Sequence, residues 1–364
     1  MSITADAARA AAKPALPADL GELRDVKIEG DIVIVDVTLR DAGGVKKSEL
    51  GERLRTALEA AGARSVELRW ADPVSVRRRP DGDPLPQVAN IILVMSGKGG
   101  VGKSTVATNL ALALHRAGSR VGILDADIYG PSIPTMLGVN GRPFSTDGKK
   151  IEPLQRFGVK LMSIGFLLED PKSAVIWRGP MLTGALMQFV GDVSWGELDY
   201  LVLDLPPGTG DIALTLAQRL KVTGAVIVTT PQEVALQDVY KAAAMCKKVE
   251  IPVLGVVENM SYFEDPAGLR HELFGAGGGQ AVADFAEAPL LGQLVLDPRA
   301  REWGDKGTPI VQAMPHLPVS KQFVQIADRL IDRIEEHNAS LTPAADFEID
   351  RSGGTGRVRL PMAK

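Results

Sequence analysis

The chain has 364 residues and a formal net charge of −4, which suits one large domain and a smaller one. This slightly acidic balance excludes a bulk electrostatic surface for nucleic acid or an anionic membrane, so we expect neither partner. The single cysteine, Cys246, excludes a disulfide within the chain, and no apolar run reaches the roughly 18 residues of a membrane span. We therefore expect a cytoplasmic protein.

The N-terminal part of the chain predicts a small α+β domain at residues 21–71. Residues 1–20 are rich in Ala and Pro, and we interpret them as a disordered lead-in. Beyond them, apolar residues alternate, switch to a helical period and alternate again. This pattern predicts strands at 26–28, 33–39 and 66–70 and a helix at 48–61.

Residues 72–89 have the composition of a linker. Four prolines and Gly82 interrupt any strand or helix in this stretch. Its run Arg77-Arg78-Arg79 either contacts a phosphate or an acidic partner, or is simply solvated. A solvated charge run is the prediction.

Residues 90–337 predict a large α/β domain. Apolar runs of strand length alternate with helical stretches, at 91–95, 121–124, 159–164, 201–203, 225–229 and 253–257. Such runs are typical of strands buried on both faces, so we predict a doubly wound, mostly parallel sheet with helices on each side. A helical period marks a last helix at 323–334, and the polar, Gly-rich tail at 338–364 is predicted to be disordered.

A phosphate-binding loop follows the first strand of this domain. Residues 97–104 read GKGGVGKS, which fits G-x-x-x-x-G-K-[ST] between a predicted strand and a predicted helix. Glycines let backbone N–H groups close around phosphate oxygens, Lys103 neutralises the β- and γ-phosphates, and the Ser104 hydroxyl binds Mg²⁺. The loop residues that we expect to bind ATP are Gly97, Lys98, Gly99, Gly100, Val101, Gly102, Lys103, Ser104 and Thr105.

Lys98 is a second lysine inside this loop. The phosphate cradle does not need it, so its side chain is predicted to point away from its own nucleotide. It would then act on the nucleotide of a second subunit, as an arginine finger does. We therefore expect Lys98 to be catalytic together with Lys103.

Acidic residues end two of the predicted strands. Since ligands bind at the carboxyl ends of strands in a doubly wound sheet, these carboxylates are expected beside the phosphate loop. We expect Asp204 to hold Mg²⁺, Asp125 to support the metal shell and Asp127 to activate the attacking water. Helix capping is the simpler alternative for these aspartates. The following loop at 206–210, PPGTG, is expected near the γ-phosphate as a nucleotide switch.

Five further segments carry a family resemblance. They are LDADIYGPSIP at 124–134, WRGPM at 177–181, WGELDYLVLDLPPGTGD at 195–211, TTPQEVAL at 229–236 and VVENMSYF at 256–263. With the loop KGGVGKST, they resemble the Mrp/ApbC iron–sulfur cluster carriers within the MinD/ParA-type ATPases. The resemblance covers residues 90–330, and the N-terminal unit looks like a degenerate small iron–sulfur assembly domain.

The resemblance implies a Mg²⁺-dependent ATPase that works as a homodimer. It implies that Lys98 reaches the nucleotide of the second subunit and that Asn259, Pro231 and Gln232 lie around adenine. It also implies that an iron–sulfur cluster is bound and passed to acceptor apoproteins or assembly factors.

The cluster ligands of that family, a C-x-x-C pair, are absent from this chain. Asp265 and Gly268 stand where the two cysteines align, and the matching N-terminal loop at 41–44 has none. A four-iron cluster normally has four thiolates, whereas two copies of this chain supply two, both from Cys246. Cys246 falls on an apolar helical stripe and is predicted to be a buried core residue.

Two functions therefore stay open. One is an ATPase that binds and transfers clusters, and the other is an ATP-dependent dimeric switch or scaffold that holds no cluster. Ligation by Glu264, Asp265 or His271 is an alternative, but hard carboxylates suit mononuclear iron or another divalent metal better than a cluster. A solvated surface loop is the simpler interpretation of that segment. Glycines break the basic C-terminal end, which disfavours a membrane-positioning ATPase.

Overall fold

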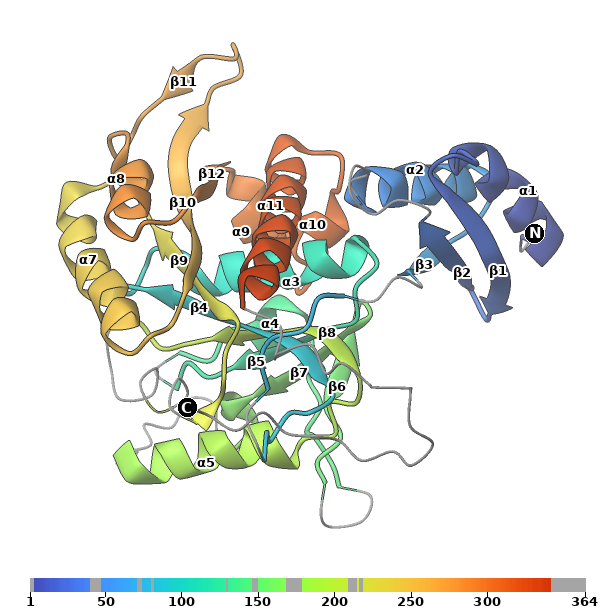
Figure 1. Cartoon of the computed structure of the whole chain (residues 1–364). Helices are drawn as coiled ribbons and strands as arrows, with labels where there is room; N and C mark the ends of the chain where they lie inside the picture. Colours follow the sequence, from blue (N-terminus) through green and yellow to red (C-terminus); the bar gives the residue numbers. More distant parts are fainter. Residues whose placement is uncertain are drawn as a thin grey trace, which may run out of the picture.

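A computed structural model describes residues 3–39, 47–70, 74–79, 82–128, 130–145, 150–167, 179–208, 215 and 219–341. Two sheets organise these residues, a three-stranded sheet near the N-terminus and a nine-stranded sheet in the rest of the chain (Figure 1). The predicted α/β fold with a small N-terminal α+β unit is therefore confirmed.

The small N-terminal domain follows the predicted order strand–strand–helix–strand. Its elements are β1 (Gly21–Glu29), β2 (Ile32–Leu39), α2 (Lys47–Ala60) and β3 (Ser65–Trp70). β2 pairs antiparallel with β1 and parallel with β3. The predicted stripe of Leu50, Leu54 and Leu58 on α2 is buried in the core of this domain.

The prediction of a disordered lead-in at residues 1–20 is wrong. Helix α1 (Ala5–Ala15) begins after Thr4, whose hydroxyl accepts a hydrogen bond from the backbone N–H of Ala7. Ala8 and Ala12 are completely buried in the core of the small domain, where α1 packs against α2. Tertiary packing of small side chains orders this helix, so no large apolar residue marks it in the sequence.

The prediction of a solvated arginine run holds for Arg78 and Arg79, which are exposed, but not for Arg77. Arg77 is buried, and its Nη2 lies 2.7 Å from Asp83 Oδ2 and 3.1 Å from the Leu85 carbonyl oxygen. A buried guanidinium requires such acceptors. This pair therefore orders the described part of the linker.

The large sheet carries its strands in the order β11-β10-β9-β4-β8-β5-β7-β6, with β12 beside β10. Every pairing from β10 through to β7 is parallel, whereas β11 and β6 pair antiparallel. β4, β5, β8 and β9 are buried at every position, as predicted for strands covered on both faces. The bounds are β4 (Val88–Ser96), β5 (Val121–Asp125), β6 (Leu154–Arg156), β7 (Val159–Ser163), β8 (Leu198–Asp204), β9 (Gly224–Thr229), β10 (Val253–Glu264), β11 (Arg270–His271) and β12 (Leu290–Val295).

Helices cover both faces of this sheet (Figure 1). The apolar residues of α3 and α11 pack on one face, and those of α5 and α7 pack on the other. The predicted doubly wound arrangement is thus observed. The bounds are α3 (Lys103–Arg116), α4 (Ile133–Met136), the 3₁₀ helix η1 (Ile164–Leu167), α5 (Gly179–Asp192), α7 (Glu233–Lys248), α8 (Gly278–Phe285), α9 (Pro298–Asp305), α10 (Ile310–Ala313) and α11 (Pro318–Ser340).

The last helix, α11, continues three residues beyond the predicted end of the large domain at 337. The remainder of the predicted tail, residues 342–364, lies outside the described residues. Within the described part of the chain, none of the helices combines the length and apolar character that crossing a membrane requires.

The small domain contacts the large domain at the C-terminal end of α3. Arg55 Nη2 donates a hydrogen bond to the Arg116 carbonyl oxygen at 2.9 Å, and the Trp70 indole N–H donates to the Ala117 carbonyl oxygen. The Arg116 side chain pairs with Glu52 at 2.8 Å. Residues of α2 and β3 therefore satisfy carbonyl groups that the end of a helix leaves unpaired.

Candidate active site

The phosphate loop connects β4 to α3. Gly100 and Gly102 have φ angles of +85° and +80°, in the left-handed region that favours glycine. A Cβ on Gly99 or Gly100 would meet nothing within 4 Å, whereas a Cβ on Gly97 would lie 2.3 Å from the backbone of α7. The loop therefore rests on α7 and leaves an open, glycine-lined side on which a phosphate group fits.

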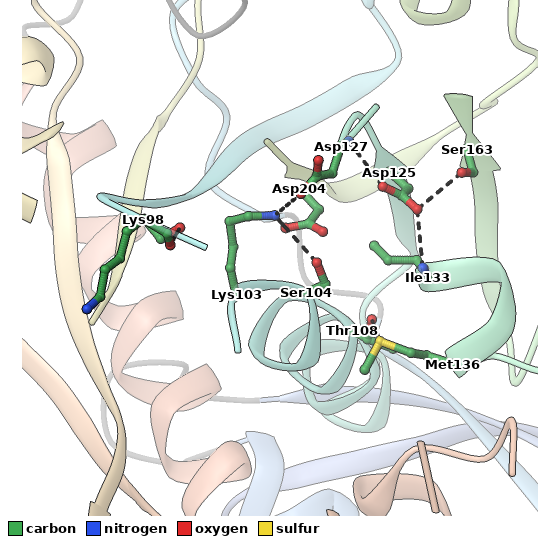
Figure 2. Close-up of polar contacts among 11 residues, drawn as sticks. Lys98, Lys103, Ser104, Thr108, Asp125, Asp127, Ile133, Met136, Ser163 and Asp204 are labelled. Atoms are coloured by element: carbon green, nitrogen blue, oxygen red, sulfur yellow. Dashed lines mark hydrogen bonds and ion pairs between the residues drawn. The ribbon is translucent and has the colours of Figure 1, made fainter. Parts of the chain in front are cut away.

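Lys103 is the cation at the centre of the site (Figure 2). Its ammonium Nζ lies 2.6 Å from Asp204 Oδ1, 3.4 Å from Asp127 Oδ2 and 3.4 Å from Ser104 Oγ. Lys103 is only 6% exposed, so water screens these interactions weakly. The structure thus brings together four residues that the sequence assigns to one site.

Asp204 ends β8 and is completely buried. Burial raises the pKa of its carboxyl group, and the neighbouring Lys103 ammonium acts in the opposite direction. Its Oδ2 atom has no hydrogen-bond partner among the described residues. A buried acceptor of this kind requires a further partner, and oxygen donors from Asp204 and Ser104 suit Mg²⁺. These two residues would hold the ion, which supplies positive charge to the phosphates when bound.

Asp125 ends β5 and is also completely buried. Its Oδ1 accepts a hydrogen bond from Asp127 N at 3.2 Å, and its Oδ2 accepts from Ile133 N at 3.2 Å and Ser163 Oγ at 3.1 Å. Burial, followed by the nearby Asp204 carboxylate, raises the pKa of Asp125 to about 7. With both oxygens held by the protein, Asp125 shapes the loop that carries Asp127 and can support the metal shell only indirectly.

A cavity of about 520 Å³ opens beside the phosphate loop. The backbone N–H of Gly208 donates to the Ser96 carbonyl oxygen at 2.9 Å, which ties the loop after β8 to the end of β4. Thr209 and Gly210 of that loop lie outside the described residues. The cavity lining combines predicted residues with others, namely Ser96, Lys98, Gly99, Gly100, Gly102, Lys103, Ser104, Thr105, Asp127, Pro131, Ser132, Thr135, Met136, Pro207, Gly304 and Asp305.

Ser163 is a site residue that the sequence analysis missed. It is the last residue of β7, it is buried, and its hydroxyl donates to Asp125. The sequence shows only a polar residue within the predicted strand 159–164. Its contact with Asp125 depends on the pairing of β5 with β7, which the sequence does not indicate.

Lys98 points away from Lys103 and Asp204, as Figure 2 shows. Its side chain is half-buried, and its backbone carbonyl accepts a hydrogen bond from Ser96 Oγ at 3.0 Å. This orientation agrees with the expectation that the Lys98 side chain points away from its own nucleotide site. The action of Lys98 on a second subunit stays a prediction.

Asn259 touches the phosphate loop itself. Its side-chain Nδ2 donates to the Val101 carbonyl oxygen at 2.9 Å, and a Cβ on Gly102 would lie 2.3 Å from the same nitrogen. Pro231 follows β9, and its carbonyl group faces the N-terminal end of α8, where a Cβ on Gly278 would lie 2.7 Å from it. The predicted contact of Asn259 and Pro231 with adenine stays a prediction.

The segment that lacks the C-x-x-C pair forms the tip of the hairpin β10–β11, which extends beyond the sheet in Figure 1. Asp265 Oδ2 lies 2.8 Å from His271 Nε2, and this hydrogen bond lowers the pKa of Asp265. Among the described residues, no group of three or more His, Cys, Asp or Glu is arranged to hold a metal ion. The alternative of a metal bound by Glu264, Asp265 and His271 is therefore not supported.

Cys246 is completely buried on α7, as predicted, and its Sγ lies 3.8 Å from Met95 Sδ. Burial raises the pKa of this thiol to about 11. Because the thiolate is the form that binds metals, Cys246 is poorly suited to hold a cluster.

The fold and this site match known proteins. A family model described as ParA, the NUBPL iron-transfer P-loop NTPase, matches residues 87–331. The chain belongs to this NTPase family. The family is one of P-loop NTPases, and this chain is accordingly an ATPase.

Relatives of this chain are named iron–sulfur cluster carrier proteins, and two of them illustrate the match. The one from Synechocystis is 44% identical over 324 residues, which are 87% of this chain and 92% of its own length. The one from Escherichia coli is 50% identical over 276 residues, which are 75% of this chain and 74% of its own length. The Mrp/ApbC resemblance is thereby confirmed.

Solved structures agree on the fold of this ATPase. A nucleotide-binding protein from Archaeoglobus fulgidus, solved in complex with ADP, has a TM-score of 0.55 and 42% identity over 66% of this chain and 100% of its own. The cell division ATPase MinD from Pyrococcus furiosus has a TM-score of 0.51 and 26% identity over 68% of this chain and 98% of its own.

Proposed function

We propose that this ATPase binds iron–sulfur clusters and transfers them to acceptor apoproteins, with ATP hydrolysis at the Lys103 site driving the cycle. The observation that carries the proposal is the convergence of Lys103, Asp204, Asp127 and Ser104 on an open glycine loop in a chain of the iron-transfer family. The cluster as cargo is supported by the names of the relatives.

Each charged residue of the site has a step to perform. Lys103 binds the β- and γ-phosphate oxygens and stabilises the charge that develops on them during transfer. Asp127, which lines the cavity, orients the attacking water and accepts its proton. Asp204 and Ser104 would hold Mg²⁺ through their side-chain oxygen atoms.

We further propose that the ATPase is a homodimer in which Lys98 acts on the nucleotide of the second subunit. The support is the direction of the Lys98 side chain, which leads away from the catalytic groups of its own loop (Figure 2). A cation delivered by another subunit stabilises the transition state as an arginine finger does.

A second candidate function is an ATP-dependent dimeric switch that holds no cluster. The observation in its favour is the thiol inventory: the only cysteine is completely buried, and Asp265 and Gly268 replace the expected ligands. In this function, partners would bind to one nucleotide state of the protein.

Anaerobic reconstitution with iron and sulfide separates the two candidates. The carrier function is supported if the full chain binds two or more irons per subunit, absorbs visible light as a cluster does, and loads an acceptor apoprotein. Intact ATPase activity without any bound cluster would contradict it and support the switch.

The double variant Asp265→Cys/Gly268→Cys is the matched control for this assay. It restores the C-x-x-C spacing at the hairpin tip, where Gly268 has open space for a side chain despite its φ of +81°. Cluster uptake by this variant alone would show that the assay works and that the natural chain has lost its own ligands.

A further inference from the structure

Glu258 is a buried carboxylate that the mechanism above does not use. It precedes Asn259 on β10, and it is 1% exposed. Its Oε1 accepts hydrogen bonds from Ser261 Oγ at 2.6 Å and Gln293 Nε2 at 2.8 Å, and its Oε2 accepts from the backbone N–H of Gly279. All three donors are neutral groups. They lie on β10, β12 and α8, so hydrogen bonds from three elements hold the Glu258 carboxylate.

The backbone of β10 is irregular just after Glu258. The register between β10 and β12 shifts between Glu258 and Tyr262, and Met260 has a φ of +55°. A non-glycine residue in this conformation requires support from its surroundings. The resulting bulge directs the Asn259 side chain out of the strand and onto the phosphate loop.

The N-terminal turn of α8 closes over this bulge. A Cβ on Gly279 would lie 2.6 Å from the Glu258 Cβ, so only glycine permits the observed approach. The helix N-terminus also favours a negative charge at this point. Glu258 therefore joins α8 and β12 to the strand that carries Asn259.

We propose that Glu258 is a positioning residue of the ATP site: it fixes Asn259 against the Val101 carbonyl group and thereby holds the phosphate loop in its nucleotide-binding shape. Asn259 touches two consecutive loop residues, so its displacement releases the turn at Val101 and Gly102. The inference rests on ATP binding at this loop and not on cluster transfer.

The variant Glu258→Gln tests this role because it keeps the shape of the side chain and replaces an acceptor by a donor. The Gly279 N–H can only donate, so an amide that accepts from it must turn its NH2 group toward Ser261 and Gln293. Both of these donors would then have to accept instead, and the hydrogen bonds that hold Glu258 would have to reorganise. We expect the KM for ATP, and the Kd for a non-hydrolysable ATP analogue, to rise about tenfold while kcat changes much less. An unchanged KM and Kd would overturn the proposal.

A double-mutant cycle with Asn259→Ala distinguishes positioning from independent contributions. If Glu258 acts through Asn259, the double variant binds ATP about as weakly as Asn259→Ala alone. If the two effects multiply to about 100-fold, Glu258 does not act through Asn259.

The matched control is Asp199→Asn, another buried carboxylate that accepts three hydrogen bonds, here from Arg120 at the opposite end of the sheet. It should lower the melting temperature and leave the KM for ATP unchanged. Should Glu258→Gln fail to fold, Gln293→Met removes one of the three donors from outside β10. If Gln293→Met has the same KM for ATP as the natural chain, the proposal is overturned. A rise in KM that is smaller than the tenfold rise expected for Glu258→Gln would support it.

The readouts separate this inference from the proposed function. A protein that binds and hydrolyses ATP but carries no cluster leaves the role of Glu258 testable by the same assays. Loss of ATP binding in Glu258→Gln leaves the question of cluster cargo to the reconstitution experiment.

Discussion

Lys103 has two carboxylate partners in the structure, Asp204 and Asp127, beside the phosphate loop. A buried ammonium group without an anion is strongly unfavourable. The two carboxylates therefore pair with the Lys103 ammonium group and orient it before ATP arrives. ATP binding exchanges part of this interaction for phosphate oxygens, so the pocket need not reorganise around a new charge.

Lys98 provides the test of action across a dimer. The variant Lys98→Ala should lower kcat by about 10³-fold, the magnitude typical of a transition-state cation, and leave the Kd for ATP within a few-fold. Steady-state hydrolysis and calorimetric titration give the two quantities. The exposed Lys247, which pairs with Glu287, supplies the control Lys247→Ala, for which activity should not change. Full turnover by Lys98→Ala would exclude the trans-acting role.

Lys103, Ser104 and Asp204, which the structure brings together, could be predicted because their chemistry is specific to a motif. Ser163 and Glu258 could not, because their roles depend on which strands become neighbours. Asp125 faces Ser163 only because β5 pairs with β7 in that register, and strand order is not readable from periodicity.

Helix α3 connects the ATP site to the small domain. Its first residue is Lys103, and its last turn holds His115 and Arg116. His115 is half-buried, and its Nδ1 lies 3.1 Å from the Ser119 carbonyl oxygen. The helix therefore has a functional group at one end and an interdomain contact at the other.

His115 makes stability depend on pH. Burial, opposed by the Ser119 carbonyl and assisted by the charge of Arg55, lowers the pKa of His115 below 6.5. As the pH falls, His115 is therefore protonated in the unfolded chain before it is protonated in the folded chain. The contribution of neutral His115 to the stability of the folded chain is present at neutral pH and is lost as the pH falls through 6.5.

The measurement is the melting temperature from about pH 8 to about pH 5.5. The natural chain should lose stability over this interval more steeply than His115→Gln, which has no titrating group at this position. Parallel curves for the two proteins would contradict the assignment.

Gly118 follows α3 at a point where the two domains meet. Its φ is +93°, and a Cβ would lie 1.8 Å from Trp70 Nε1. We expect Gly118→Ala to destabilise the protein by about 1–3 kcal/mol, because the backbone is strained and Trp70 must move. Denaturant unfolding measures this change.

The control for this variant is Gly184→Ala. Gly184 is an exposed residue inside α5, and a Cβ there would meet nothing within 4 Å. This substitution should stabilise the protein by about 0.5–1 kcal/mol, the usual gain of Ala over Gly in a helix. Equal effects of the two substitutions would show that Gly118 has no special role.

Elements with strong periodicity could be predicted, and those that depend on packing could not. The apolar runs of β4 and β8 and the apolar stripe of α2 are visible in the sequence pattern. Helix α1 does not, because Ala8 and Ala12 become core residues only when the sheet of the small domain is present.

At the scale of the whole molecule, Arg55 secures the contact between the two domains. Its guanidinium is buried and donates to the carbonyl oxygens of Val66 and Arg116, one in each domain. Burial lowers the pKa of Arg55 to about 10, so it stays charged at neutral pH. A residue that no sequence motif marks therefore contributes directly to the contact between the two domains.

We expect Arg55→Met to weaken docking by about 3 kcal/mol, since hydrogen bonds from a charged donor are the strong ones. Scanning calorimetry should then resolve a separate, earlier transition for the small domain. The exposed Arg64, which pairs with Asp31, gives the control Arg64→Met with an unchanged profile. A single transition in Arg55→Met at the temperature of the natural chain would show that other contacts suffice.

The burial of Cys246 has a practical consequence for experiments on this ATPase. Thiol-specific reagents react with thiolates at the surface, and the only thiol of the chain is enclosed between α7 and the sheet. Any cysteine introduced on the surface will thus be the single labelling site of each subunit. A spin label or fluorophore on the β10–β11 hairpin can then report its distance to the second subunit of the proposed homodimer while ATP is turned over, without removal of a native residue.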